Sequence, residues 1–309
     1  MRAWRFDDSA AVPALFMEEV SEPEPGPGEL LVCIRAAGVT PTELSWHPTT
    51  HTKTGEKRSH AIPGHEFSGT VAAAGAGTSG VAAGEEVFGM NDWFADGATA
   101  EYCLSRPEWI ARKPADLTHA EAASVPIGAL TAWQGLFDRA KLQAHERVLI
   151  HGGSGAVGTW AIQLARRQGA HVITTASARN REFVQRLGAE QVIDYRTQSF
   201  EDIVQGIDVV FDAVGGTTLQ RSWDVLGPKG RLVTIAADSE GLSDERTKSA
   251  FFIVEPNREQ LARIGSLLEA GEIRPAVDVV APFAQAGAAY TGTIKGRSGR
   301  GKVVVEVTK

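Results

Sequence analysis

A glycine-rich segment between a predicted strand and a predicted helix is the clearest chemical signal in the sequence. Residues 153–158, Gly-Ser-Gly-Ala-Val-Gly, fit the pattern G-x-G-x-x-G. Without side chains, the backbone can turn tightly and approach a pyrophosphate at the start of a helix. Glycine clusters also occur in ordinary loops, but this one follows an apolar strand predicted at 147–151 and opens an amphipathic helix predicted at 157–168. The pattern predicts a dinucleotide site whose contacts in the turn are Gly153, Gly155, Ala156, Val157 and Gly158.

The residues after this turn indicate which dinucleotide binds. An NAD site usually carries an acidic residue about 20 positions further on, where it binds the ribose 2′-hydroxyl. From Ser154 through Arg181 the sequence contains no Asp or Glu, and Ser177, Arg179 and Arg181 follow the next predicted strand. A hydroxyl and guanidinium groups suit a 2′-phosphate, because arginine binds phosphate in a planar fork. These residues favour NADPH; the alternative is that the arginines only solvate the following helix.

The cysteine content gives little support to metal chemistry. Cys33 and Cys103 are the two cysteines of the chain, and they lie far apart without a C-x-x-C pair. A zinc lobe with four cysteine ligands is therefore excluded. Both cysteines are expected as small core residues in strands.

The elements that must position these residues fall into two groups along the chain. Short strands are predicted at 29–35, 67–74, 86–89 and 101–104, with frequent glycine turns, which is typical of a small β-barrel. From Thr118, whose partner Glu121 completes a helix-start signature, helices and strands alternate. The alternation predicts a parallel, doubly wound sheet. The elements expected after Thr118 are strands at 147–151, 171–176, 191–193, 208–212, 231–236, 251–254 and 302–307, and helices at 131–140, 157–168, 181–187, 218–226 and 259–269.

Length and composition set broad limits on the protein. A chain of 309 residues suits two domains, and 43% hydrophobic with 22% charged residues is ordinary for a folded protein. The net charge of −7 argues against a broad nucleic-acid surface. The sequence has no run of roughly 18 apolar residues and no signal-peptide pattern at its start. We therefore expect a cytoplasmic protein that binds neither nucleic acid nor a membrane.

Several ordered motifs together carry a resemblance that covers essentially the whole chain. The sequence resembles the zinc-free quinone oxidoreductase branch of the medium-chain dehydrogenase/reductase (MDR) superfamily. The motifs are Gly38-Val39-Thr40-Pro41-Thr42-Glu43, Pro63-Gly64-His65-Glu66-Phe67-Ser68-Gly69, Gly84-Glu85-Glu86-Val87-Phe88-Gly89, Ala129-Leu130-Thr131-Ala132, the glycine turn, Leu187-Gly188-Ala189, Val192-Ile193-Asp194-Tyr195, Phe211-Asp212-Ala213-Val214-Gly215-Gly216 and Arg300-Gly301-Lys302.

The resemblance implies an α/β fold in which a GroES-like β-barrel catalytic domain is formed by both ends of the chain, at 1–122 and 257–309. A Rossmann domain with a doubly wound parallel sheet, at 123–256, would be inserted between them and bind NADPH. The resemblance also implies a homodimer, formed through an edge strand at 251–254. The implied contacts of the 2′-phosphate are Ser177, Arg181, Tyr195 and, less strongly, Arg300, and those of the nicotinamide are Thr131, Val214, Phe252 and Ile253.

The departures from the zinc enzymes of this superfamily define the expected chemistry. Those enzymes place a cysteine where Thr40 stands, whereas their His and Glu survive as His65 and Glu66. One imidazole and one carboxylate do not complete a catalytic zinc site, which needs three protein ligands. We expect no metal, and we expect His65 and Glu66 to form a structural hydrogen-bonding pair. Quinone oxidoreductases often carry Asn at the Thr40 position, so this polar contact is altered here.

Without zinc, reduction of a quinone or an α,β-unsaturated carbonyl is easier to support than alcohol oxidation. Thr40 and Thr131 are the predicted substrate or nicotinamide contacts, and no general acid can be assigned. Glu43 and His47 are weaker candidates on the same loop as Thr40. The aromatic residues Trp46, Trp93, Phe94 and Trp109 suit either a pocket wall for a flat acceptor or core packing.

The leading hypothesis is therefore an NADPH-dependent oxidoreductase that transfers hydride to a small quinone or carbonyl substrate. One alternative is an enoyl reductase or an unusual cyclase acting on a natural-product intermediate. Another is a non-catalytic NADPH-binding protein with a regulatory role.

Overall fold

The computed structural model describes residues 1–7, 14–240 and 244–307 and divides into two compact units. Unit 1 comprises Met1–Ile127, Glu255–Ser298 and Lys302–Lys309, and unit 2 comprises Gly128–Val254 and Gly299–Gly301. Within the described ranges, every helix is too short or too polar to span a bilayer.

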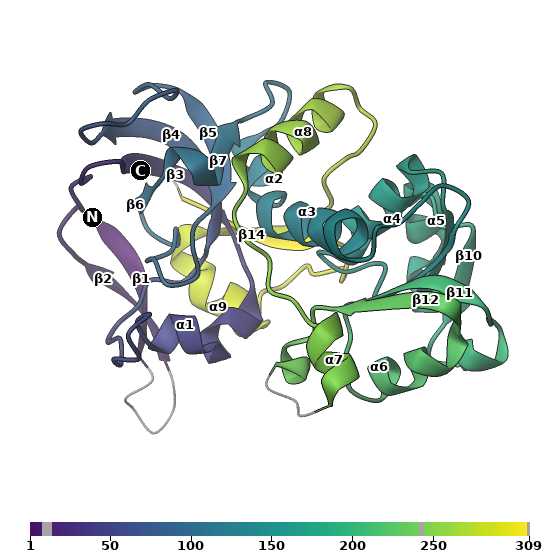
Figure 1. Cartoon of the computed structure of the whole chain (residues 1–309). Helices are drawn as coiled ribbons and strands as arrows, with labels where there is room; N and C mark the ends of the chain where they lie inside the picture. The colour runs from purple at the N-terminus through teal and green to yellow at the C-terminus, as the bar shows by residue number, and fades with distance from the viewer. Residues whose placement is uncertain (8–13, 241–243, 308–309) are drawn as a thin grey trace. The chain divides into compact units, whose positions relative to one another are not determined.

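Unit 1 is built on a mainly antiparallel sheet with the strand order β13-β14-β3-β4-β5-β7, and β6 pairs with β3 (Figure 1). A separate hairpin joins β1 and β2. Side chains from alternate positions of β3 fill the core, because successive residues of a strand point to opposite faces. The strands are β1 (Arg2–Asp7), β2 (Ala14–Glu19), β3 (Leu30–Gly38), β4 (Glu66–Ala74), β5 (Glu86–Met90), β6 (Tyr102–Ser105), β7 (Ile110–Arg112), β13 (Val277–Pro282) and β14 (Lys302–Glu306).

Strand β14 joins the two ends of the chain in one sheet. It runs parallel to β13 and antiparallel to β3, with Val304 opposite Gly38. The four residues from 302 to 305 are buried, which fits a central strand covered on both faces. This pairing places the segment after the α/β run in the same sheet as the first β-rich segment.

The helices of unit 1 are short apart from α8. The predicted start at Thr118 is confirmed, because the Thr118 side chain accepts from the Glu121 N–H while the Glu121 side chain bonds back to Thr118. The helices are α1 (His47–Thr50), α2 (His119–Ala123), α8 (Arg258–Glu269) and α9 (Ala286–Tyr290), with 3₁₀ turns at Pro41–Ser45, Pro107–Trp109 and Phe283–Gln285.

Unit 2 contains a five-stranded parallel sheet with the order β10-β9-β8-β11-β12 and helices on both faces (Figure 1). The strands are β8 (Arg147–His151), β9 (His171–Ala176), β10 (Gln191–Asp194), β11 (Ile207–Asp212) and β12 (Leu226–Thr234). The helices are α4 (Gly158–Arg167), α5 (Arg181–Leu187), α6 (Gly216–Ser222) and α7 (Glu245–Ala250), with 3₁₀ turns at Ala178–Asn180, Phe200–Asp202, Trp223–Val225 and Ala237–Ser239.

This strand order places a topological switch point between β8 and β11, because β9 and β10 extend the sheet on one side and β11 and β12 on the other. Ligands of open α/β sheets bind outside the carboxyl ends of the strands at such a point. The predicted fold class, a GroES-like β unit with a Rossmann-type parallel sheet, is confirmed.

Two local predictions were incomplete or wrong, and two elements were missed. The helix expected at 131–140 is α3 (Pro126–Trp133) followed by a π-helical segment, Gln134–Arg139. Residues 251–254 form no strand, since Phe251 makes only one isolated bridge, to Thr234. The dimer edge expected there therefore lacks its strand, and the homodimer stays a prediction. The sequence also gave no signal for the β1–β2 hairpin or for β13.

Candidate active site

The glycine turn follows β8 in unit 2, and its glycines are required by close backbone packing. Gly152 has a φ of 80°, which favours glycine. A Cβ on Gly153 would lie 2.0 Å from Thr174 Oγ1, and a Cβ on Gly158 would lie 2.2 Å from the Gly152 carbonyl oxygen. Gly155 is looser, with that same oxygen at 3.3 Å. The first and third glycines of the motif therefore leave no room for a side chain, whereas the second, on the open face of the turn, has nearly enough room for a methyl group.

The start of α4 offers unused backbone donors. The N–H groups of Val157 and Gly158 have no acceptor among the residues that the structure describes, whereas Ala156 lies beside the isolated parallel bridge between Gly155 and Gly301. Val157 occupies the N-cap position without a side-chain cap. Unpaired N–H groups at a helix start attract anions, and the helix dipole adds to that attraction. These residues fit the pyrophosphate of a dinucleotide.

A distant segment of unit 2 braces this turn. The Gly301 N–H donates to the Ser154 carbonyl at 2.9 Å. Arg300 donates from Nε to Asn180 Oδ1 at 2.9 Å and from Nη2 to the Arg179 carbonyl at 2.8 Å. Asn180 in turn donates to Ser154 Oγ at 3.0 Å. Arg300 thus holds the glycine turn and the turn after β9 together, a bracing function that the sequence did not reveal.

The turn after β9 carries the residues predicted to select the cofactor. Ser177 is buried directly after the strand. Arg181 is the first residue of α5 and donates to the Val192 carbonyl at 2.9 Å, so one nitrogen of its guanidinium is already bonded. Tyr195 is 58% exposed after β10, with Arg196 stacked over its ring at 5.9 Å. The structure brings a hydroxyl, several cations and an exposed aromatic ring to the ends of β9 and β10.

The residues predicted beside the nicotinamide are only partly suited to that role. Val214 follows β11 and is 52% exposed, and Ile253 is 44% exposed. Phe252 is buried against the π-helical segment, where its ring lies 3.0 Å from the position of a Cβ on Gly135 and 5.5 Å from the Arg139 guanidinium. The Phe252 side chain therefore packs in the core of unit 2, and only its backbone is left for a ligand. Thr131 is also buried, on α3.

Asp212 organises the turn after β11. Its carboxylate accepts the N–H of Val214 at 3.1 Å and that of Gly215 at 3.1 Å, and Thr234 Oγ1 donates to it at 2.8 Å. Burial raises the pKa of Asp212, and the hydrogen bonds from Thr234, Gly215 and Val214 oppose that shift. The exposed Val214 is thereby fixed next to Gly152, whose added Cβ would lie 3.4 Å from Val214 Cγ2.

In unit 1, Thr40 lies beside a buried ion pair. Lys302 of β14 forms an ion pair with Glu66 of β4 and donates to Thr40 Oγ1 at 2.8 Å. Glu66 also accepts the Ile127 N–H at 2.9 Å. Burial raises the pKa of Glu66, whereas the neighbouring ammonium lowers it. The sequence did not single out Lys302, although a lysine beginning a strand of valines was a signal that could have found it.

His65 belongs to a second buried pair rather than to one with Glu66. Its Nδ1 lies 2.6 Å from Glu43 Oε2, and its Nε2 lies 3.2 Å from the Ala95 carbonyl oxygen. Glu43 also accepts the Gly64 N–H at 3.1 Å. The predicted hydrogen-bonding pair of His65 and Glu66 is therefore wrong, because His65 bonds Glu43 instead. Glu43, a weaker candidate for a ligand contact, is a buried structural group. His47, the other loop candidate, stacks on His51 at 4.3 Å.

These contacts do not fit a catalytic zinc site. His65 is already placed between the Glu43 carboxylate at Nδ1 and the Ala95 carbonyl oxygen at Nε2. Glu66 is paired with an ammonium, and Thr40 offers a hydroxyl that already accepts a hydrogen bond. Over the described ranges, no group of three or more His, Cys, Asp or Glu side chains is arranged to hold a metal ion.

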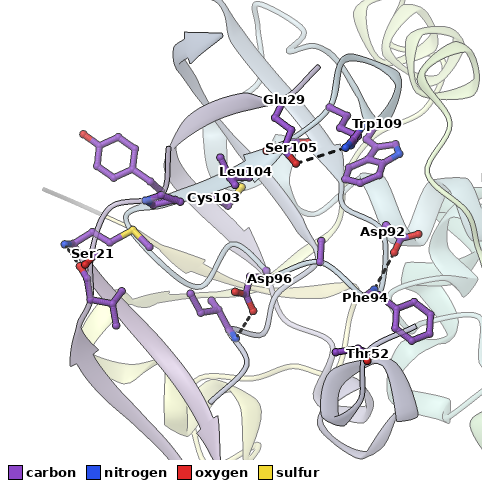
Figure 2. A pocket seen from close by; sticks show the side chains of 18 of the residues that line it. Ser21, Glu29, Thr52, Asp92, Phe94, Asp96, Cys103, Leu104, Ser105 and Trp109 are labelled. Carbon is purple, nitrogen blue, oxygen red and sulfur yellow. Dashed lines mark hydrogen bonds and ion pairs between the residues drawn. The ribbon is translucent and has the colours of Figure 1, made fainter. Parts of the chain in front are cut away.

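The aromatic residues of unit 1 separate into two places. Trp93 is buried, with Trp46 edge-on at 4.8 Å and His65 at 5.0 Å. Phe94 and Trp109 instead line a surface hollow of about 830 Å³ (Figure 2). Figure 2 shows Asp92 and Thr52 near Phe94, and Glu29 near Trp109. The four aromatic residues do not form the single pocket wall that the sequence suggested.

Comparison with known proteins agrees with this architecture. Residues 187–305 match the zinc-binding dehydrogenase family, and residues 26–116 match the alcohol dehydrogenase GroES-like domain. The chain is 34% identical to a probable mitochondrial zinc-binding oxidoreductase of Arthroderma benhamiae, over 96% of this chain and 95% of that protein. It is 30% identical to a chloroplastic NADPH-dependent alkenal/one oxidoreductase of Arabidopsis thaliana, over 92% of this chain and 73% of that protein.

A solved structure extends the similarity to the whole fold. The quinone oxidoreductase of Coxiella burnetii superimposes with a TM-score of 0.88 at 30% sequence identity, covering 100% of this chain and 99% of that one. The agreement spans both units, including the barrel of unit 1 and the parallel sheet of unit 2. The chain therefore belongs to the medium-chain dehydrogenase/reductase superfamily and is quinone oxidoreductase-like within it.

Proposed function

We propose that this protein is an NADPH-dependent reductase that transfers hydride to a quinone or an α,β-unsaturated carbonyl compound without a metal ion. The observation that carries the proposal is the glycine turn at the switch point of unit 2, with open N–H groups and no acidic residue at the end of β9. The names of the Arabidopsis and Coxiella proteins support the acceptor class. In this proposal unit 2 is the cofactor domain.

The preference for NADPH rests on charge at the end of β9. Ser177, Arg179 and Arg181 stand where an NAD enzyme usually carries a carboxylate. A carboxylate there would repel a 2′-phosphate, whereas a hydroxyl and guanidinium groups can bond it. Tyr195 offers an exposed ring to the same end of the cofactor, and Arg300 stabilises the turn that carries these groups.

The protein's part in the reaction is binding, orientation and stabilisation of charge. Bound NADPH would supply the hydride. The N–H groups of Val157 and Gly158 would hold its pyrophosphate, and the apolar Val214 and Ile253 would shield the nicotinamide from water. The Thr40 hydroxyl would contact the acceptor. No zinc step is assigned, because His65, Glu66 and Thr40 are bonded to other groups of the protein.

A turnover screen tests the proposal. The purified protein would be mixed with NADPH or NADH and a panel of quinones and enones, and the nicotinamide absorbance would be followed. We expect NADPH oxidation with at least one acceptor, a clear preference over NADH, and unchanged rates in a chelator. Equal use of the two cofactors would refute the assignment of Ser177 and Arg181. Loss of activity in chelator with recovery on added zinc would refute the metal-free mechanism.

A further inference from the structure

Three polar groups of unit 1 form a chain that ends at Thr40. Glu66 is fully buried, Lys302 is 4% exposed, and Thr40 is half-buried. The Lys302 ammonium pairs with Glu66 Oε1 and donates to Thr40 Oγ1 at 2.8 Å. A lysine that is nearly excluded from water needs such a carboxylate partner, because an unpaired buried charge is very costly. Lys302 is therefore a fixed positive charge directed at one hydroxyl.

The sheet is built so that this pair can form across an intervening strand. Glu66 lies on β4 and Lys302 on β14, and β3 runs between them. Gly38, the last residue of β3, leaves the space that the Glu66 side chain fills. A Cβ on Gly38 would lie 2.5 Å from both Cγ and Oε1 of Glu66. Because Gly38 has no side chain, the carboxylate can cross the end of β3 and reach the ammonium.

The Thr40 hydroxyl does not cap the turn that follows it. It occupies the N-cap position of the 3₁₀ turn Pro41–Ser45, where a threonine side chain usually accepts a backbone N–H. Here the side chain makes no such cap. Its oxygen accepts from Lys302 instead, and among the described residues the hydroxyl has no acceptor for its own proton. That proton is thus available for donation to a ligand.

We propose that Lys302, held by Glu66, is a positioning residue that makes Thr40 a strengthened hydrogen-bond donor for the carbonyl oxygen of the acceptor. This inference rests on the proposed reductase function. During reduction, the hydride forms a new C–H bond at the electrophilic carbon, the π electron pair moves to the carbonyl oxygen, and the cofactor is left oxidised. Thr40 stabilises that developing negative charge, and a proton from water completes the product.

Lys302 acts through its charge on the Thr40 hydroxyl and is held in place by Glu66. A hydroxyl that accepts a hydrogen bond from a cation is itself a stronger donor, because neighbouring hydrogen bonds polarise one another. Removing one donor to a developing oxyanion lowers kcat by about 10²–10³ in a well-studied protease. We expect a loss toward the lower end, on the order of 100-fold, because Thr40 is half-buried.

The test is a set of matched variants assayed with an acceptor that the wild type reduces. Thr40→Val keeps the shape and removes the hydroxyl, and Thr40→Ser restores it. We expect Thr40→Val to lower kcat on the order of 100-fold with little change in KM, and Thr40→Ser to recover most of the rate. Affinity for NADPH, measured by fluorescence titration, should be the same in both variants, which separates this role from cofactor binding.

The contribution of Lys302 is tested by a double-mutant cycle. Lys302→Met alone leaves Glu66 unpaired and can prevent folding, so the cycle uses Glu66→Gln with Lys302→Met, and folding is checked by thermal unfolding. This pair of changes should lower kcat about tenfold when Thr40 is present and cause no further loss in the Thr40→Val background. Equal losses in both backgrounds would overturn the role of Lys302.

The outcomes distinguish this inference from the proposed function. Wild-type turnover with an unchanged kcat in Thr40→Val would overturn the inference and leave the reductase proposal standing. Tight NADPH binding without turnover of any quinone or enone by the wild type would overturn both. Loss of kcat in Thr40→Val with no recovery in Thr40→Ser would also count against it, because it would indicate a packing role for the side chain.

Discussion

Replacing single glycines of the turn after β8 tests whether this turn binds the cofactor or only supports the fold. In Gly158→Ala the new Cβ would lie 2.2 Å from the Gly152 carbonyl oxygen and 2.7 Å from Gly153 Cα. Both atoms belong to the backbone, so no side-chain rotation relieves the clash. In Gly155→Ala the nearest atom is the Gly152 oxygen at 3.3 Å, which a small shift accommodates. One variant therefore distorts the turn, while the other only adds a methyl group to its open face.

The expected magnitudes differ accordingly. Overpacking of this kind costs about 1–3 kcal/mol, so Gly158→Ala should lower the free energy of unfolding by that amount. It should also displace N–H groups from the pyrophosphate, and the loss of one charge-assisted hydrogen bond, worth about 1.5–3 kcal/mol, weakens NADPH binding roughly 10- to 150-fold. Gly155→Ala should weaken NADPH binding with a change in stability below about 0.5 kcal/mol.

Two measurements check this pair of variants. Fluorescence titration gives the NADPH dissociation constant, and denaturant unfolding of the cofactor-free protein gives the stability. The free protein is required because bound ligand itself stabilises the folded state. Gly158→Ala with wild-type stability and wild-type affinity would refute the reasoning from backbone contacts. Wild-type affinity in Gly155→Ala would show that the open face of the turn does not receive the pyrophosphate.

Three further predictions concern cofactor choice, helix stability and pH. Ser177→Asp should raise the NADPH dissociation constant at least tenfold and improve NADH binding, because the new carboxylate repels a 2′-phosphate; titration with both cofactors measures it. Gly265→Ala, on α8, places a Cβ in ordinary contact 3.9 Å from Phe88 and should stabilise the protein by about 0.5–1 kcal/mol in denaturant unfolding. Burial lowers the pKa of His151 to about 3, so the unfolded chain binds the extra proton first, and the stability contributed by neutral His151 is lost as pH falls from about 6.5 toward 3. His151→Gln should reduce that pH dependence, measured by unfolding across the same range.

Each of these has a result that contradicts it. A Ser177→Asp protein that keeps the wild-type preference for NADPH would show that Ser177 does not face the 2′-phosphate. A destabilised Gly265→Ala would mean that α8 tolerates no methyl group beside Phe88. Identical pH profiles for wild type and His151→Gln would show that the buried imidazole, bonded to Ser222 Oγ at 3.0 Å, does not control acid stability.

The parts of the fold that could be predicted from sequence are those with local signals. Thr118 and Glu121 are three residues apart, and each bonds the other's backbone as the motif predicts. Gly188 ends α5 with a φ of 118°, as expected for a glycine after a helix. The glycine turn is equally local, because its contacts lie within one strand, one turn and one helix. Hydrophobic periodicity and turn chemistry report such features directly.

The missed parts depend on contacts between distant residues. Lys302 and Thr40 are separated by 262 positions, and only the pairing of β14 with β3 brings them together. His65 bonds Glu43, 22 positions away, rather than its chain neighbour Glu66, which pairs with Lys302. Phe252 was assigned to the ligand, but the small Gly135 opens a space that its ring fills. None of these choices is visible in a short window of sequence.

The brace formed by Arg300 also affects the order in which the protein is completed during synthesis. The strands of unit 2 lie between Arg147 and Thr234. Asn180, however, bonds Arg300, which is synthesised 120 residues later. At about 5–20 residues per second, that interval is roughly 6–24 s on the ribosome. The nascent unit can form its parallel sheet during this time while the glycine turn remains unbraced. The contacts that link the glycine turn to the turn after β9 are therefore completed late, only after Arg300 and Gly301 have left the ribosome and joined unit 2.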